Sequence, residues 1–78
     1  MTLIDATRLR IVSLLKKRKF SQYQLAERSC ISKTTISEFL NKKTNNITLI
    51  TLFHICEGFN LDLQEFFSDR VFDNVEQD

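Results

Sequence analysis

The sequence predicts an all-α fold, a compact bundle of five short helices. Apolar residues recur at the three- and four-residue spacing of amphipathic helices, and small polar residues that suit helix N-termini precede successive apolar runs. The 78 residues include one Gly, no Pro and seven Phe, and 42% of them are apolar, which is typical of a globular chain. Because a chain of this size buries roughly 60% of its unfolded surface, its core must be packed efficiently.

The first helix is expected over residues 4–18. Its inward side, read at the spacing of one helix face, comprises Ile4, Ile11, Leu14, Leu15 and Arg18. Residues 16–19 are all cationic, which favours the negative end of the helix dipole. Phe20 is expected to enter the core immediately before the next helix begins.

Residues 21–41 predict two helices joined by a tight turn, which is the arrangement of a helix-turn-helix. Ser21 and Gln24 form an S-x-x-Q capping box at the start of the first helix of this pair. Leu25 and Ala26 then fall on its inward side, so this helix is expected to support the one that follows.

Ser32 starts the second helix of the pair, and Ile36 and Leu40 lie four residues apart on its inward face. Its outward face carries hydroxyl and mixed polar side chains, namely Lys33, Thr34, Ser37, Glu38 and Asn41. An ordinary surface helix would show more long charged residues. Side chains of this kind suit hydrogen bonds to base edges and phosphates, so we expect this helix to face duplex DNA.

Residues 41–47 are the most loop-like segment, because Asn and Lys dominate and the apolar rhythm stops. Thr48 can cap a fourth helix over residues 49–59. The broad apolar face of this helix is expected to comprise Leu49, Leu52, Phe53, Cys56 and Phe59. Gly58 costs roughly 1 kcal/mol against Ala inside a helix, which indicates a close helix contact. Asn60 suits a left-handed residue after the helix.

Asp62 and Glu65 predict a D-x-x-E cap for a short fifth helix over residues 63–68. The helix-turn-helix domain is therefore expected to span residues 1–68, followed by an acidic C-terminal tail over residues 69–78. Three apolar residues of the tail could continue a helical stripe: Val71, Phe72 and Val75.

Charge is distributed unevenly along the chain. Residues 1–60 hold ten Lys or Arg and four Asp or Glu, a balance of +6, whereas residues 61–78 hold one Arg and six Asp or Glu, a balance of −5, which together make the net charge of +1. Because an electrostatic footprint depends on local potential, the basic segment suits nucleic acid despite the near-neutral total. The alternative is that both sets of charges are only solvated surface.

In their order and spacing, these blocks resemble the lambda repressor/Cro-like (XRE-type) helix-turn-helix family over about residues 9–67. The matching blocks are Ser21-Gln22-Tyr23-Gln24-Leu25-Ala26, Ser32-Lys33-Thr34-Thr35-Ile36-Ser37, Thr48-Leu49-Ile50-Thr51-Leu52-Phe53-His54-Ile55 and Leu61-Asp62-Leu63-Gln64-Glu65-Phe66-Phe67. The resemblance implies a sequence-specific regulator of transcription that binds double-stranded DNA, most simply a bacterial or phage repressor acting as a homodimer on a near-palindromic operator.

Family members often have Gly after the first helix, in the turn and after the recognition helix. This chain has Lys19, Cys30 and Lys42 at those places. If the turns are kept, one or more of these residues must adopt positive φ at a cost of roughly 1 kcal/mol each. Ile47 also replaces a Pro that is frequent in the loop of the family.

The resemblance also implies roles for single residues. Base reading in the major groove falls to Lys33, Thr34, Ser37 and Glu38. Phosphate contact falls to Gln22, Thr35, Asn41, Lys42 and Lys43. The alternative for Gln22 is a second capping residue, and the alternative for Lys42 and Lys43 is solvated loop charge. The candidates for a dimer interface near the fifth helix and the tail are Phe66, Phe67 and Phe72, and their alternative role is core.

The sequence favours no enzymatic, metal or cofactor site. Cys30 and Cys56 are expected to be free thiols, and with a single His they cannot complete a four-ligand zinc site. His54 has no clustered carboxylate or Cys partner, so it is expected to be a partly exposed helix residue. No nucleophile–base pair or Gly-rich phosphate loop is visible.

No apolar run approaches the ~20 residues needed to span a bilayer, and acidic and basic residues interrupt the N-terminal segment, which makes a poor signal peptide. The protein is therefore expected to be cytoplasmic. The near-neutral total charge and acidic tail leave a second function open. The chain could be an antitoxin or a protein-binding adaptor that keeps the helix-turn-helix fold, with a toxin or an antirepressor as its protein partner.

Overall fold

A computed structural model of the chain describes residues 1–76 and confirms the all-α fold with a helix-turn-helix formed by the second and third helices. The elements are α1 (Leu3–Arg18), α2 (Gln22–Ser29), α3 (Lys33–Leu40), α4 (Leu49–Gly58), α5 (Leu63–Phe67) and a 3-10 turn, η1 (Arg70–Phe72). Every predicted helix is present, and for the first, fourth and fifth helices, whose bounds were predicted, the ends lie within one residue of the expected ones. Residues 77–78 of the expected tail lie outside the described residues.

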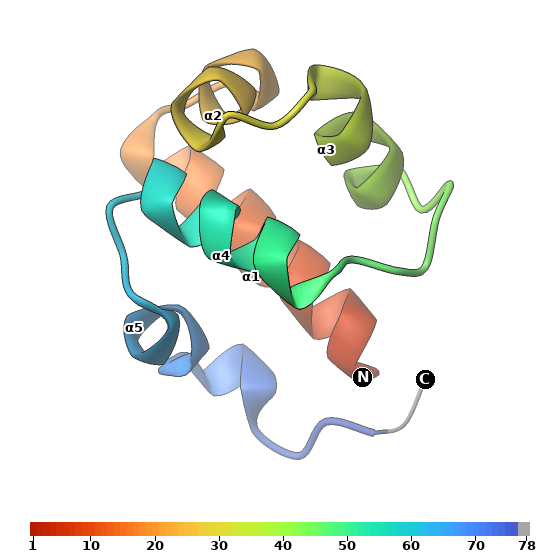
Figure 1. Cartoon of the computed structure of the whole chain (residues 1–78). Coiled ribbons are helices and arrows are strands. Elements are labelled where there is room, and N and C mark those ends of the chain that lie inside the picture. The colour runs from red at the N-terminus through yellow and green to blue at the C-terminus, as the bar shows by residue number, and fades with distance from the viewer. Residues whose placement is uncertain (77–78) are drawn as a thin grey trace.

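The helix-turn-helix sits at one end of the molecule and α5 at the other. In Figure 1, α1 and α4 run through the middle, α2 and α3 lie above them, and α5 and η1 lie below. Helix α2 packs against both α3 and α4, and α1 contacts α3 and η1. The two ends of the described chain meet, since the amino group of Met1 lies 3.1 Å from Glu76 Oε1 and the Leu3 N–H donates to the Glu76 carbonyl.

The core lies where α1, α2, α3 and α4 converge, closed at the far end by α5. Its buried apolar side chains are Ile11, Leu14, Leu15, Leu25, Ala26, Ile36, Phe39, Leu52, Ile55, Cys56, Phe59 and Phe66. The half-buried Phe20 enters the core as expected, with its ring stacked on that of Phe59 at a centroid distance of 6.0 Å. The core assignment of Cys56 is likewise confirmed.

The helix starts follow from local sequence. The predicted caps Ser21, Ser32, Thr48 and Asp62 each accept a hydrogen bond from the backbone N–H three residues later. Both predicted capping boxes are complete, because the side chains of Gln24 and Glu65 accept in return from the cap residues' own N–H groups. Thr2 caps α1 in the same way, a role that sequence analysis did not assign.

Four helices end on a residue in the left-handed conformation, and none of the four is Gly. The φ angles are 60° at Lys19, 55° at Cys30, 63° at Lys42 and 59° at Asn60. After α3, for example, the Lys42 N–H donates to the Phe39 carbonyl and the Lys43 N–H to the Glu38 carbonyl, the paired bonds of a Schellman motif. All three non-Gly replacements therefore take the positive φ that the turns demand, and the expectation for Asn60 is confirmed.

The single Gly serves a helix contact instead. A Cβ added at Gly58, the last residue of α4, would lie 2.1 Å from Ser29 Oγ and 3.2 Å from Leu25 Cδ1 of α2. This distance confirms the close helix contact predicted from the sequence. Only at a residue without a side chain can α2 and α4 approach so closely.

Two expectations about the apolar faces are wrong. Leu49 and Phe53 of α4 were expected in the core but are 71% and 42% exposed. The inward face of α4 is instead centred between Ile55 and Cys56, so that Leu49 and Phe53 lie at its margin. The helical stripe expected beyond α5 is limited to the short η1 turn, because Asp73 after that turn is extended, and Val75 is exposed. Within residues 1–76, no helix combines the length and apolar character that a bilayer crossing needs.

Candidate nucleic-acid interface

Helix α3 is held from behind by two buried side chains, Ile36 and Phe39. Sequence analysis assigned the inward face to Ile36 and Leu40. Phe39 is in fact the second buried residue, and Leu40 is only half-buried. Since Ile36 and Phe39 are three residues apart, they still define one inward face and leave the opposite face of α3 to solvent.

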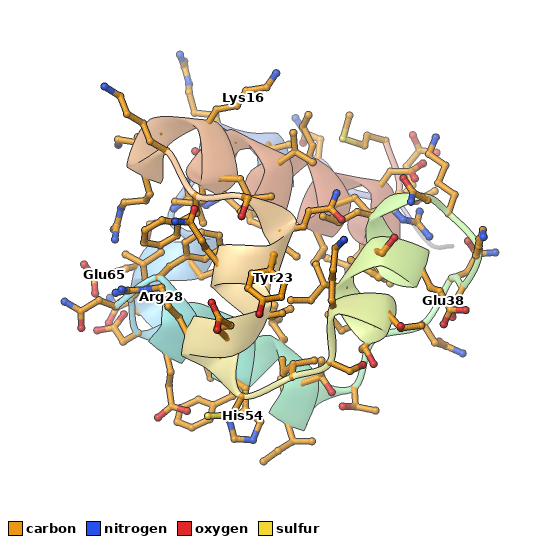
Figure 2. The ribbon with its side chains drawn as sticks, turned by 90° about the horizontal axis from the view of Figure 1, so that it is seen from above. Lys16, Tyr23, Arg28, Glu38, His54 and Glu65 are labelled. Carbon is orange, nitrogen blue, oxygen red and sulfur yellow. The ribbon has the colours of Figure 1, made fainter. Side chains whose placement is uncertain are left out.

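The four candidate base-reading residues lie together on that opposite face. Lys33, Thr34 and Glu38 are exposed, Ser37 is half-buried, and the four line one shallow depression that is completed by Lys43 from the following loop. In Figure 2, Glu38 projects from the edge of the helix away from the other helices. The depression therefore joins two cationic side chains, a carboxylate and two hydroxyls, which can donate to and accept from base edges.

The candidate phosphate-contacting residues are spread more widely. Asn41, Lys42 and Lys43 are exposed at the C-terminal end of α3, and the Asn41 amide donates to Ser37 Oγ at 3.1 Å. Gln22 is the first residue of α2 and is half-buried. Thr35 is exposed on α3, but its hydroxyl lies 2.8 Å from Ser32 Oγ as part of the cap network. Thr35 lines a cavity of about 270 Å³ between α3 and α4 and does not line the depression formed by the base-reading candidates.

The basic residues of the segment 1–60 divide by type, which the charge count did not show. Its four Arg residues all donate to backbone carbonyls: Arg8 to Phe39 and Thr44, Arg10 to Glu65 and Phe66, Arg18 to Phe59, and Arg28 to Gly58. Arg8 is buried and Arg10 half-buried, whereas Arg18 and Arg28 are exposed. Its six Lys residues, at positions 16, 17, 19, 33, 42 and 43, are all exposed. Figure 2 shows Lys16 extending from α1 into solvent. Lysine therefore supplies most of the exposed positive charge of this segment, and within the described residues 1–76 no Lys side chain is held by a backbone carbonyl as the Arg side chains are.

The three candidate interface residues form one aromatic cluster. The ring centroids of Phe66 and Phe67 are 5.1 Å apart, and those of Phe67 and Phe72 are 4.8 Å apart. Phe66 is 0% exposed, so its assignment to an interface is corrected to a core role: it closes the core from below. Phe67 is 40% exposed and Phe72 is half-buried, so these two remain at the surface.

The remaining singled-out residues have ordinary environments. His54 is partly exposed as expected, but its Nδ1 lies 3.2 Å from Glu57 Oε1, so the expectation that it lacks a carboxylate partner is wrong. Cys30 and Cys56 are free. Burial raises the pKa of the Cys56 thiol to about 11. In the described part of the chain, no three His, Cys, Asp or Glu side chains form a group suited to a metal ion.

An apolar surface on α4 was missed by sequence analysis. It comprises Leu49, Ile50 and Phe53, of which Ile50 is 64% exposed. The apolar periodicity of α4 could not distinguish these residues from its buried face, because both sets recur at helical spacing.

Comparison with known proteins agrees with this geometry. Residues 10–70 match the family model described as a Cro/C1-type HTH DNA-binding domain, and this match includes all of α2, α3, α4 and α5. No curated protein and no solved structure matches the chain.

Proposed function

Because this chain belongs to the Cro/C1-type HTH DNA-binding domain family, we propose that it is a sequence-specific transcriptional regulator, a repressor that binds a near-palindromic operator as a homodimer. DNA binding follows from the family, whereas the operator, the sign of regulation and the dimer belong to the proposal. As a repressor, the dimer would exclude polymerase from a promoter in the cytoplasm of a bacterium or of a phage host.

The observation that carries the proposal is the two-sided character of α3. Its inward face is buried through Ile36 and Phe39, while Lys33, Thr34 and Glu38 face solvent. A helix supported in this way can enter the major groove without rearrangement, because an α-helix fits that groove. We assign Lys33 to guanine O6 and N7, Glu38 to cytosine N4, and Thr34 to a thymine methyl group.

Phosphate contacts would position the helix in the groove. Lys42 and Lys43 follow α3 directly and are exposed, and the backbone of Gln22 lies at the N-terminus of α2, where helix N–H groups favour an anion. Asn41 and Thr35 would add neutral hydrogen bonds. These contacts fix the register of the protein on the duplex and carry no sequence information themselves.

A dimer would extend the small site of one chain. Two-fold pairing would place two copies of α3 about 34 Å apart, on successive major-groove faces of the operator. We place the interface at the exposed edge of the aromatic cluster, with Phe67 and Phe72 as its members. The competing face is the apolar surface of Leu49, Ile50 and Phe53 on α4.

Selection of binding sites from random duplexes with the purified chain tests the function. We expect a recovered motif with two-fold symmetry, and an affinity that falls steeply with salt as phosphate contacts release counterions. Failure to enrich any motif, combined with no salt-sensitive binding, would contradict the proposal.

The exposed apolar surface on α4 supports a second candidate, a protein-binding role such as that of an antitoxin. Leu49, Ile50 and Phe53 are exposed together on one helix, and a contiguous exposed apolar patch is typical of a protein-binding surface. Stoichiometric co-purification of a partner that is lost on Ile50→Asp, together with absent duplex binding, would favour this candidate over the repressor.

A further inference from the structure

We infer that Arg8 is a positioning residue for DNA contact. From α1, it holds both the end of α3 and the loop that follows, and this loop carries Lys42 and Lys43. This inference rests on the proposed function and deepens it. Arg8 lies on α1, outside the helix-turn-helix, and would not itself touch the duplex.

One guanidinium joins three parts of the chain. Arg8 Nε donates to the Phe39 carbonyl at 2.7 Å, and Nη2 donates to the Thr44 carbonyl at 2.6 Å and to Asn45 Oδ1 at 3.0 Å. Nη1 donates to Asp5 Oδ1 at 2.9 Å within α1. The guanidinium carbon also lies 4.9 Å from the centroid of the Phe39 ring. Such a planar fork can hold several acceptors at once in fixed directions.

The bonds of Arg8 bracket the cationic loop. Phe39 lies near the C-terminal end of α3 and Thr44 lies five residues later, so Lys42 and Lys43 fall between the two anchored carbonyls. Because the acceptors are backbone groups, the bonds fix the path of the chain itself. The side chain of Arg8 is only 8% exposed. Its bonds are therefore little weakened by competing water.

The loop over residues 41–46 has few other long-range hydrogen bonds among the described residues. Its backbone bonds run back to α3, from Asn41 to Ser37, from Lys42 to Phe39 and from Lys43 to Glu38, or stay within the loop, as from Asn46 to Thr44 Oγ1. These local bonds set the turn, whereas Arg8 ties the loop to α1. Without Arg8, Thr44 and Asn45 would lose that tie, and the two Lys side chains would be presented from a less ordered loop.

Arg10 provides a matched control on the same helix. It donates to the carbonyls of Phe66 at 2.8 Å and Glu65 at 3.0 Å, and pairs with Asp69 at 3.2 Å. Its side chain is 12% exposed. Arg10 is thus nearly as buried as Arg8 and, in the part of the chain that the structure describes, makes three hydrogen bonds where Arg8 makes four, but its bonds hold α5 and the tail, at the opposite end of the molecule from α3.

The test measures binding of a mixed-sequence DNA duplex against salt concentration for the full chain and for Arg8→Met, Arg8→Lys and Arg10→Met, each at matched folded fraction. Each lost phosphate contact lowers the slope of log affinity against log salt by about 0.9. We expect Arg8→Met and Arg8→Lys to lower that slope by roughly one to two and to weaken binding roughly tenfold at low salt. Arg10→Met should keep the salt slope. Its affinity is left out of the comparison, because Arg10 holds α5 and the tail, where the proposed dimer surface of Phe67 and Phe72 lies.

A measurement without DNA separates this inference from the function. Amide hydrogen exchange over residues 42–46 should accelerate roughly tenfold in Arg8→Met and Arg8→Lys and stay unchanged in Arg10→Met. If the wild-type chain does not bind the duplex but exchange in the loop accelerates in the Arg8 variants as expected, the proposed function fails and the anchoring of the loop by Arg8 stands. Equal slopes for the Arg8 and Arg10 variants, or unchanged exchange in the loop, would overturn the positioning role.

Discussion

Ser29 Oγ of α2 lies directly against the backbone of Gly58 in α4, and it is buried with no hydrogen-bond partner among the described residues. The contact allows α2 and α4 to meet closely, but it leaves one hydroxyl unsatisfied in the interior. Both consequences can be measured, because the two residues can be changed separately and together.

We expect Gly58→Ala to destabilise the protein by about 1–2 kcal/mol. The clash of the new Cβ with Ser29 costs about 1–3 kcal/mol, which exceeds the roughly 1 kcal/mol that Ala gains in helix propensity. Ser29→Ala should stabilise by roughly 0.5–1 kcal/mol, because it removes an unpaired polar group, and the double variant should recover most of the loss. Urea denaturation measures all three. A loss of stability in Ser29→Ala would show that the hydroxyl is bonded.

Gly at the left-handed helix ends should stabilise the fold. Cys30→Gly and Lys19→Gly are each expected to raise the free energy of unfolding by about 0.5–1 kcal/mol, because Gly has no Cβ to strain at positive φ. Lys17→Gly is the control: it lies inside α1 and should cost roughly 1 kcal/mol. Thermal denaturation measures all three variants. If Gly lowered stability at Cys30 and Lys19 as it does at Lys17, the left-handed residues would not be strained.

Base-reading and phosphate-contacting residues should differ in how their loss is distributed over sequences. We expect Lys33→Ala to relax the preference at one base pair of the selected motif. Lys43→Ala should weaken all sequences alike and lower the salt slope by about one. Affinities for a set of single-base variants of the motif distinguish the two patterns, and identical loss profiles would contradict the assigned roles.

The position of the dimer interface can be decided by introducing charge. Phe67→Asp should shift the chain toward monomer by at least roughly tenfold in dissociation constant, because a desolvated carboxylate is unfavourable in an apolar interface. Phe53→Asp, on the competing surface of α4, should leave self-association unchanged. Analytical ultracentrifugation measures both, and the reverse pattern would move the interface to α4.

The buried thiol predicts a loss of stability at alkaline pH. Burial raises the pKa of Cys56 from 9.0 to about 11, so between these values the unfolded chain loses a proton that the folded chain keeps. Stability is therefore fully present below pH 9 and should fall by up to roughly 1.4 kcal/mol per pH unit as the pH rises toward 11. Comparison with Cys56→Ala isolates this contribution, since the variant should lack that component of the slope.

Local signals made the helices and their ends predictable. Ser21 and Asp62 cap through atoms within three residues of themselves, so the residues that start a helix are visible in a short window of sequence. The resemblance singled out Lys19, Cys30 and Lys42 as the places where one or more residues must be left-handed, and all three are. The outward face of α3 was also foreseen, because Lys33 and Glu38 stand at helical spacing opposite Ile36.

Only the tertiary structure decided which helix faces are buried and which cationic side chains are hydrogen-bonded to the protein's own backbone. Phe66 and Phe53 are both aromatic residues on short helices, yet one is enclosed and the other exposed, since burial depends on neighbours distant in the chain. The four Arg residues that donate to backbone carbonyls could not be told from free cations, because their carbonyl partners lie 30 to 56 residues away. The sequence by itself determined the helices and the polar face that α3 offers. The packing determined how firmly that face is held, because long-range contacts depend on the assembled fold and not on local spacing.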